Sequence, residues 1–143
     1  MSHSKNQILA RASRVDLEDL GRNMRVVDLK HGQVVADTRQ RVPYVYFPHG
    51  GILSAIVELE SGWAIETGMI GKDGVFGAAQ AIDGKLSLNK VMVQVPDQAS
   101  VVDAEHLKAV HNPRRSFSRF WSSTKHSSWP KYSRQPPATR YTA

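Results

Sequence analysis

Six histidines and no cysteine limit the metal chemistry open to this chain of 143 residues. Without cysteine there is no disulfide, no thiolate metal ligand and no cysteine nucleophile. A metal site on a β-barrel needs two histidines one residue apart, with an acid and a third histidine. No histidine pair has that spacing, and His31 and His49 stand beside glycines in predicted turns. We therefore predict no metal ligand and expect surface histidines.

Serine and glutamate side chains offer the remaining candidates for catalysis. They are Ser54, Ser61 and Ser87, and Glu58, Glu60 and Glu66. The serines lack the sharp glycine-flanked turn of an activated nucleophile, and no serine, histidine and aspartate can be grouped. The glutamates flank a predicted hairpin at Gly62, where a carboxylate pair is one reading and a solvated outer face is the more ordinary one. We predict no catalytic residue, so that the protein is not an enzyme.

Four glycines, at positions 71, 74, 77 and 84, have a spacing loosely similar to that of a phosphate-binding loop. The lysine followed by serine or threonine that completes such a loop is missing, and so is its strand-loop-helix context. Turns in a β-protein are the better explanation.

The net charge of +6 comes from one end of the chain. Residues 1–110 contain 12 Lys/Arg and 13 Asp/Glu, whereas residues 111–143 contain 7 Lys/Arg and no acid. The second segment, with Trp121, Trp129 and Tyr132 among its cations, resembles a nucleic-acid-binding tail, and binding through it is one alternative function. It has no apolar period, so we predict a disordered tail.

Most of the chain alternates with the period of two that is typical of strands. Alternation is found in 26–29, 34–35, 42–47, 53–59, 63–69 and 91–95, with Gly and Pro turns between. Helical spacing covers 8–12 and 15–20, Ser13 and Asp16 form a capping pair, and Asp103 opens a helix over 104–110. Trp63 is expected to be a core or cross-strand aromatic. The pattern predicts a mainly β fold, an antiparallel β-roll or jelly roll with short flanking helices.

This order of elements resembles the cyclic-nucleotide-binding-like sensor domain of Crp/Fnr transcription regulators. The similarity covers about residues 6–110 and is carried by four segments in order. These are Val45-Tyr46-Phe47-Pro48, the strand-turn-strand from Gly51 to Met69, the run from Ile70 to Gly77, and Val93-Gln94-Val95-Pro96. It implies a regulatory sensor that responds to a small-molecule effector, if to any. A cupin-like metal-dependent enzyme on a related roll is the other alternative.

The resemblance also implies where a ligand would bind. Nucleotide-binding members carry a phosphate cassette that reads Phe-Gly-Glu, followed about ten residues later by Arg; Glu accepts from the ribose hydroxyl and Arg pairs with the phosphate. The matching ligand-pocket positions in this chain are Phe76, Gly77, Ala78, Ser87, Leu88 and Asn89. Both polar anchors are missing, and Lys85 or Lys90 would offer only a point charge. We predict that cAMP does not bind and that no cofactor is needed.

Full-length relatives bind DNA as homodimers through a long helix and a helix-turn-helix domain, and we expect this chain to lack that domain. Residues 111–143 are predicted to be out of frame. When the codons of residues 128–142 are read from their third base into the next codon, they can encode fourteen consecutive residues that are compatible with the family. Trp129 followed by Pro130 must then encode alanine, since the single Trp codon ends in G. We expect the shift between about His111 and Trp121. With no signal peptide and no apolar run long enough to span a membrane, we predict a cytoplasmic protein.

Overall fold

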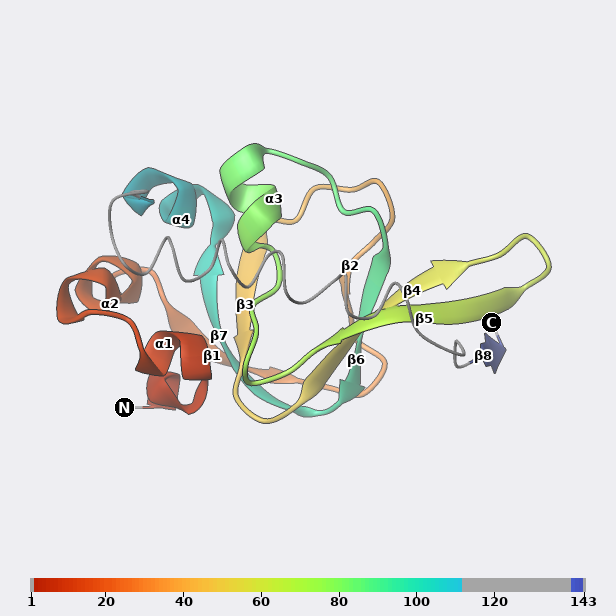
Figure 1. The fold of residues 1–143 in the computed structure, drawn as a ribbon, viewed down its shortest axis with the longest axis horizontal. Helices are drawn as coiled ribbons and strands as arrows, with labels where there is room; N and C mark the ends of the chain where they lie inside the picture. Colours follow the sequence, from red (N-terminus) through yellow and green to blue (C-terminus); the bar gives the residue numbers. More distant parts are fainter. Residues whose placement is uncertain (1, 112–139, 143) are drawn as a thin grey trace.

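The computed structural model describes residues 2–111 and 140–142, which form two antiparallel sheets with a layer of short helices at one end (Figure 1). The helical elements are the 3₁₀ helix η1 (Ser2–Lys5), α1 (Gln7–Ala10), α2 (Arg14–Gly21), α3 (Ala78–Asp83) and α4 (Ala104–Val110). The strands are β1 (Arg25–Leu29), β2 (Val34–Ala36), β3 (Tyr44–Pro48), β4 (Ile52–Glu58), β5 (Trp63–Ile70), β6 (Lys90–Val95), β7 (Asp97–Asp103) and β8 (Arg140–Thr142). The predicted β-roll of jelly-roll type is confirmed.

The smaller sheet has the strand order β1-β7-β3, and the larger one β2-β6-β4-β5-β8. Every paired strand in both sheets is antiparallel. β7 lies at the centre of the smaller sheet, where Val101 is opposite Arg25 on one side and Tyr46 on the other. Chain segments about 75 residues apart therefore meet in that sheet.

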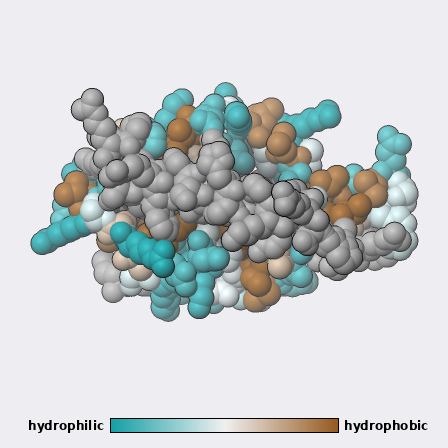
Figure 2. Space-filling model, viewed as in Figure 1, coloured by the Kyte–Doolittle hydropathy of each residue, from teal (hydrophilic) through white to brown (hydrophobic). Residues whose placement is uncertain are grey.

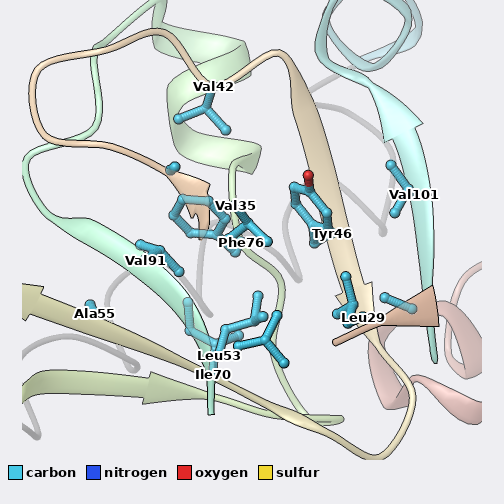
Figure 3. Close-up of a cluster of buried hydrophobic side chains, with 13 residues drawn as sticks. Leu29, Val35, Val42, Tyr46, Leu53, Ala55, Ile70, Phe76, Val91 and Val101 are labelled. Carbon is cyan, nitrogen blue, oxygen red and sulfur yellow. The ribbon is translucent and has the colours of Figure 1, made fainter. Parts of the chain in front are cut away.

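One hydrophobic cluster fills the space between the two sheets (Figure 3). β3 and β7 contribute Tyr46 and Val101 from the smaller sheet, and β4 and β6 contribute Leu53 and Val91 from the larger one. Phe76 enters from the segment before α3, with its ring centroid 6.4 Å from that of Tyr46. Because strand side chains alternate between faces, Val45 and Phe47 point the other way.

Those two residues belong to a second cluster, between the smaller sheet and the helices. Ile8, Leu9 and Leu107 of the helical layer pack in it. The smaller sheet is thus buried on both faces, and the molecule has three layers in the order helices, small sheet, large sheet. Within the described residues, no helix has both the length and the apolar character needed to cross a membrane.

Caps and turns follow the sequence closely. Ser13 accepts from the Asp16 amide at 3.2 Å, and its hydroxyl donates to the Asp16 carboxylate at 2.8 Å, so the predicted capping pair is confirmed. Gly62 adopts φ of +91° in the β4–β5 turn, where glycine is favoured. Hydrophobic side chains are exposed around this hairpin (Figure 2), among them Val57 and Leu59. Trp63 is 42% exposed, which corrects its prediction as a core residue, although it does pair across strands with Thr142.

Candidate ligand-binding site

The segment from Phe76 to Asn89 joins β5 to β6 and contains all six sequence-predicted site residues. Phe76 is buried and anchors the segment to the small sheet. Its amide donates to the Tyr46 carbonyl at 2.9 Å, and its carbonyl accepts from the Tyr46 amide at 2.8 Å. This backbone bridge fixes where α3 begins.

Gly77 makes the turn from that bridge into α3 with φ of +97°. A β-carbon at this position would lie 2.7 Å from the Tyr44 carbonyl oxygen and 3.2 Å from Val42 Cγ1. Both the conformation and the close approach require glycine. Gly84 ends the helix in the same left-handed region, with φ of +68°, but has open space around it. The two glycines therefore serve turns, as the sequence predicted.

Ala78 lies at the first position of α3, where the nucleotide-binding cassette has its carboxylate. It is only 6% exposed and packs in the cluster beneath the helical layer, with Leu9 and Leu107. A carboxylate at this position would be surrounded by apolar side chains in this structure. The site residue Ala78 is thus a packing residue here.

Ser87 is buried, and its backbone pairs with the loop between β2 and β3. The Arg39 amide donates to the Ser87 carbonyl at 2.7 Å, and the Ser87 amide donates to Gln40 at 3.0 Å. The Ser87 hydroxyl donates to the Asn89 carbonyl at 2.7 Å. Arg39 holds φ of +63°, a strained value for a residue with a side chain. The cassette loop is therefore tied to its neighbour by backbone bonds that need no ligand.

Leu88 and Asn89 occupy the region where an arginine would contact phosphate. Leu88 is 84% exposed. Asn89 Nδ2 donates to Thr67 Oγ1 at 3.4 Å, and the Thr67 hydroxyl donates to the Ala55 carbonyl at 3.2 Å. The positions that the sequence resemblance matched to the arginine thus hold an exposed leucine and a neutral hydrogen-bonded chain.

Neither nearby lysine takes over the role of the arginine. Lys90 Nζ is 3.0 Å from Glu58 Oε1, so its charge is already paired. Lys85 is exposed and lines a shallow hollow of about 590 Å³ with Ala79, Leu86 and Leu88. Asp83 also lines that hollow, and its carboxylate would repel a phosphate placed beside Lys85.

A second hollow, of about 360 Å³, lies on the outer face of the large sheet. Ser54, Ile56 and Met92 line it, on the face opposite to the core residues of β4 and β6. The buried Ser54 hydroxyl donates to Glu66 at 2.9 Å and also contacts the Gln94 side chain. Glu58 and Glu66 thus have different partners, Lys90 and Ser54, and do not form the carboxylate pair considered from the sequence.

Two histidines that were expected at the surface differ in their exposure to solvent. His31 is exposed, as predicted, but His49 is only 5% exposed, so its prediction as a surface residue is wrong. The His49 ring lies against Ser100, with Nε2 2.7 Å from the hydroxyl oxygen. Turn glycines beside His49 suggested exposure, whereas the start of η1 and strand β7 cover the ring. Among the described residues, no group of three or more His, Asp or Glu is placed to hold a metal ion.

Asn6 is a residue that the sequence analysis did not single out. Its side chain is fully buried and makes four hydrogen bonds. Oδ1 accepts from the amides of Ile8 and Leu9, at 3.0 and 3.3 Å, and Nδ2 donates to the carbonyls of Pro48 and Gly74, at 2.8 and 3.0 Å. Asn6 therefore caps α1 and ties it to the segment that leads into the cassette.

Solved structures with the same architecture identify the fold. The sensor domain of the transcriptional regulator DNR from Pseudomonas aeruginosa superposes with a TM-score of 0.65 at 14% identity, covering 86% of this chain and 84% of that one. The regulatory domain of Toxoplasma gondii PKA, crystallised with cAMP, gives 0.68 at 13% identity, covering 86% and 46%. The fold is that of a cyclic-nucleotide-binding domain.

A third similar structure is the regulatory subunit of a cAMP-independent protein kinase A from Trypanosoma brucei, with a TM-score of 0.64 and 9% identity. It is matched over 85% of this chain and 48% of its own, so this chain spans about half the length of the two kinase regulatory chains. No protein-family model and no curated protein sequence matches. Identities this low establish the fold alone.

Proposed function

We propose that residues 6–110 are the sensor domain of a Crp/Fnr-type transcription regulator that responds to an effector other than a cyclic nucleotide. The observation that carries this proposal is a segment that turns from β5 into a short helix at a glycine but has no polar anchors. Gly77 makes a left-handed turn into α3, Ala78 follows it where the cassette has a carboxylate, and residues 87–89 contain no arginine. The role is regulatory, and no catalysis is proposed.

The absence of the carboxylate and the arginine lowers the expected affinity for a cyclic nucleotide. Hydrogen bonds to charged groups contribute about 1.5–3 kcal/mol each. Loss of a bidentate arginine–phosphate pair and of one ribose bond therefore removes at least about 4.5 kcal/mol, or roughly 10³-fold in affinity. A site that would bind cAMP at micromolar concentration with these anchors is left at millimolar affinity or weaker.

Calorimetric titration of the full chain with cAMP and with cGMP tests this exclusion. We expect no saturable heat at millimolar nucleotide. The matched variant Leu88→Arg places a guanidinium at an exposed position, so it leaves the fold intact while it returns one anchor. A micromolar dissociation constant for the unsubstituted chain would refute the proposed loss of nucleotide recognition.

The assignment to a transcription regulator has a separate test. We propose that residues 111–143 are read out of frame and that the neighbouring frame encodes the dimerisation helix and DNA reader of the family. Sequencing the DNA beyond codon 110 should reveal an open frame of roughly a domain's length. Expression with that frame restored should give a dimer that prefers one palindromic site. A neighbouring frame closed by early stop codons would refute this part of the proposal.

A further inference from the structure

The Ser100 hydroxyl on β7 lies between two imidazole rings. Its oxygen is 2.5 Å from His3 Nδ1 and 2.7 Å from His49 Nε2. Ser100 is fully buried and His49 nearly so, whereas His3 is partly exposed. The other ring nitrogen of His49, Nδ1, is buried and has no hydrogen-bond partner. One hydroxyl thus bridges two titratable rings from η1 and from the residue after β3.

Because His49 Nδ1 has no hydrogen-bond partner, the donor and the acceptor of each contact with Ser100 can be assigned. A buried N–H without an acceptor is rarer and less favourable than a buried acceptor without a donor. His49 Nδ1 therefore carries the lone pair, and His49 Nε2–H donates to Ser100. The single Ser100 proton is then donated to His3 Nδ1. In this arrangement both rings are neutral, and each of the two contacts has one donor and one acceptor.

An added proton has no acceptor inside this bridge. On His49 it would occupy Nδ1, which would create a buried cationic N–H without a partner. On His3 it would occupy Nδ1, which would turn the acceptor of the Ser100 hydroxyl into a donor. Burial lowers the pKa of both histidines below the usual value. Of the neighbouring charges, His3 and then Lys5, both on η1, lower the pKa of His49 further, and Asp97 on β7 opposes this. The N-terminal ammonium lowers the pKa of His3.

The bridge is continuous with the contacts that hold the N-terminal segment. His3 is three residues before Asn6, and Asn6 donates to the carbonyls of Pro48 and Gly74. Ile8 and Leu9 follow at once and are fully buried against the small sheet. A change at His3 and His49 therefore acts on the end of the chain that these contacts keep in place.

We propose that the His3–Ser100–His49 bridge is an acid-sensitive latch, which holds residues 2–10 on the small sheet and releases them when either ring takes up a proton. Release would also remove the Asn6 bond to Gly74, three residues before the cassette glycine Gly77. That consequence for a sensor rests on the proposed function, whereas the latch itself does not depend on which effector binds.

Hydrogen exchange measured by NMR on the full chain tests the latch. The reporters are the amides of Ile8 and Leu9, which are bonded to Asn6, and the protection factors are corrected for intrinsic exchange at each pH. We expect these factors to fall by about tenfold or more between pH 7.5 and 5. Amides of β4 and β6 exchange only through more extensive unfolding, so they should stay more strongly protected than those of Ile8 and Leu9 at every pH in this range.

Two substitutions remove the titration while keeping the bonds. The Asn amide oxygen in His3→Asn can accept as Nδ1 does, and the Gln amide in His49→Gln can donate as Nε2–H does. The double variant should lose most of the pH dependence, and His31→Gln, at an exposed histidine, should keep all of it. If buried His49 does not tolerate substitution, His3→Asn alone should reduce the fall. An unchanged fall in these variants, or no fall in the unsubstituted chain, would overturn the latch.

Discussion

Replacing Asn6 should show how strongly the N-terminal segment contributes to the fold. In Asn6→Ala, the cap of α1 is lost, which costs about 1 kcal/mol. The carbonyls of Pro48 and Gly74 also lose a donor, at about 1–3 kcal/mol for each buried acceptor left unpaired. From four bonds to a fully buried side chain, we expect a loss of at least about 3 kcal/mol in the free energy of unfolding.

Urea denaturation followed by circular dichroism measures this loss. With a slope of about 1–3 kcal/mol per molar urea, the midpoint should fall by about 1–3 M. Asn89→Ala provides a matched control, because Asn89 is partly exposed and its side chain donates one long bond, to Thr67. We expect its midpoint to change by less than about one third as much.

Asn6→Asp separates the cap from the bridge. Aspartate caps helices as well as asparagine does, so a residue that acts only as a cap would tolerate this change. The carboxylate has no donor for the Pro48 and Gly74 carbonyls and would bring a negative charge against them. We therefore expect Asn6→Asp to destabilise the protein at least as much as Asn6→Ala. An Asp variant as stable as the unsubstituted chain would refute the role of Asn6 as a bridge.

Four further results are expected. Gly77→Ala should destabilise the protein by at least about 1 kcal/mol more than Gly84→Ala in thermal unfolding, because both have positive φ but only Gly77 faces backbone within 3 Å. Ala78→Glu should lower the free energy of unfolding by about 3 kcal/mol or more, since it buries a carboxylate among apolar side chains. It should not create cAMP binding. A variant that folds normally and binds cAMP would show that the structure places the Ala78 side chain wrongly. The pKa of His3 and of His49 lies below 6.5 in the folded state, so the unfolded chain binds protons more readily. The free energy of unfolding should therefore be constant above about pH 7.5 and decrease as the pH falls through 6.5. A flat profile between about pH 7.5 and 5 would contradict this. The seven Lys/Arg of residues 111–143 should give weak, salt-dependent and sequence-independent DNA binding, and anisotropy titrations that reveal a strong preference for one palindrome would be inconsistent with it.

Strand alternation and turn residues were sufficient to predict most of the fold. The helix over 104–110 and six of the strands lie within two residues of their predicted bounds. β7 was missed because Ser100 and the polar residues Asp97 and Gln98 interrupt its apolar pattern, although the strand is central. α3 is absent from the predicted elements because its six residues stand between Gly77 and Gly84, two glycines that indicate turns.

The site was only partly predictable, for a different reason. The absence of the carboxylate and the arginine is a matter of residue type, and it can be read from Ala78 and Leu88 directly. The burial of Asn6 and His49 depends on partners 42 to 68 residues away for Asn6 and 51 residues away for His49. No local pattern encodes such contacts, so His49 was expected at the surface and Asn6 was not singled out.

The central position of β7 sets the order in which a ribosome can complete this fold. β1 and β3 are both made long before β7, and each must wait for it, since neither pairs with the other. At 5–20 residues per second, about 5–20 s separate the synthesis of Asn6 from that of Ser100. During that interval the N-terminal segment has no sheet on which to dock, and its apolar residues are open to chaperones. A nascent chain interrupted before residue 97 would lack the strand on which the whole small sheet depends, whereas a change of reading frame after residue 110 would spare it.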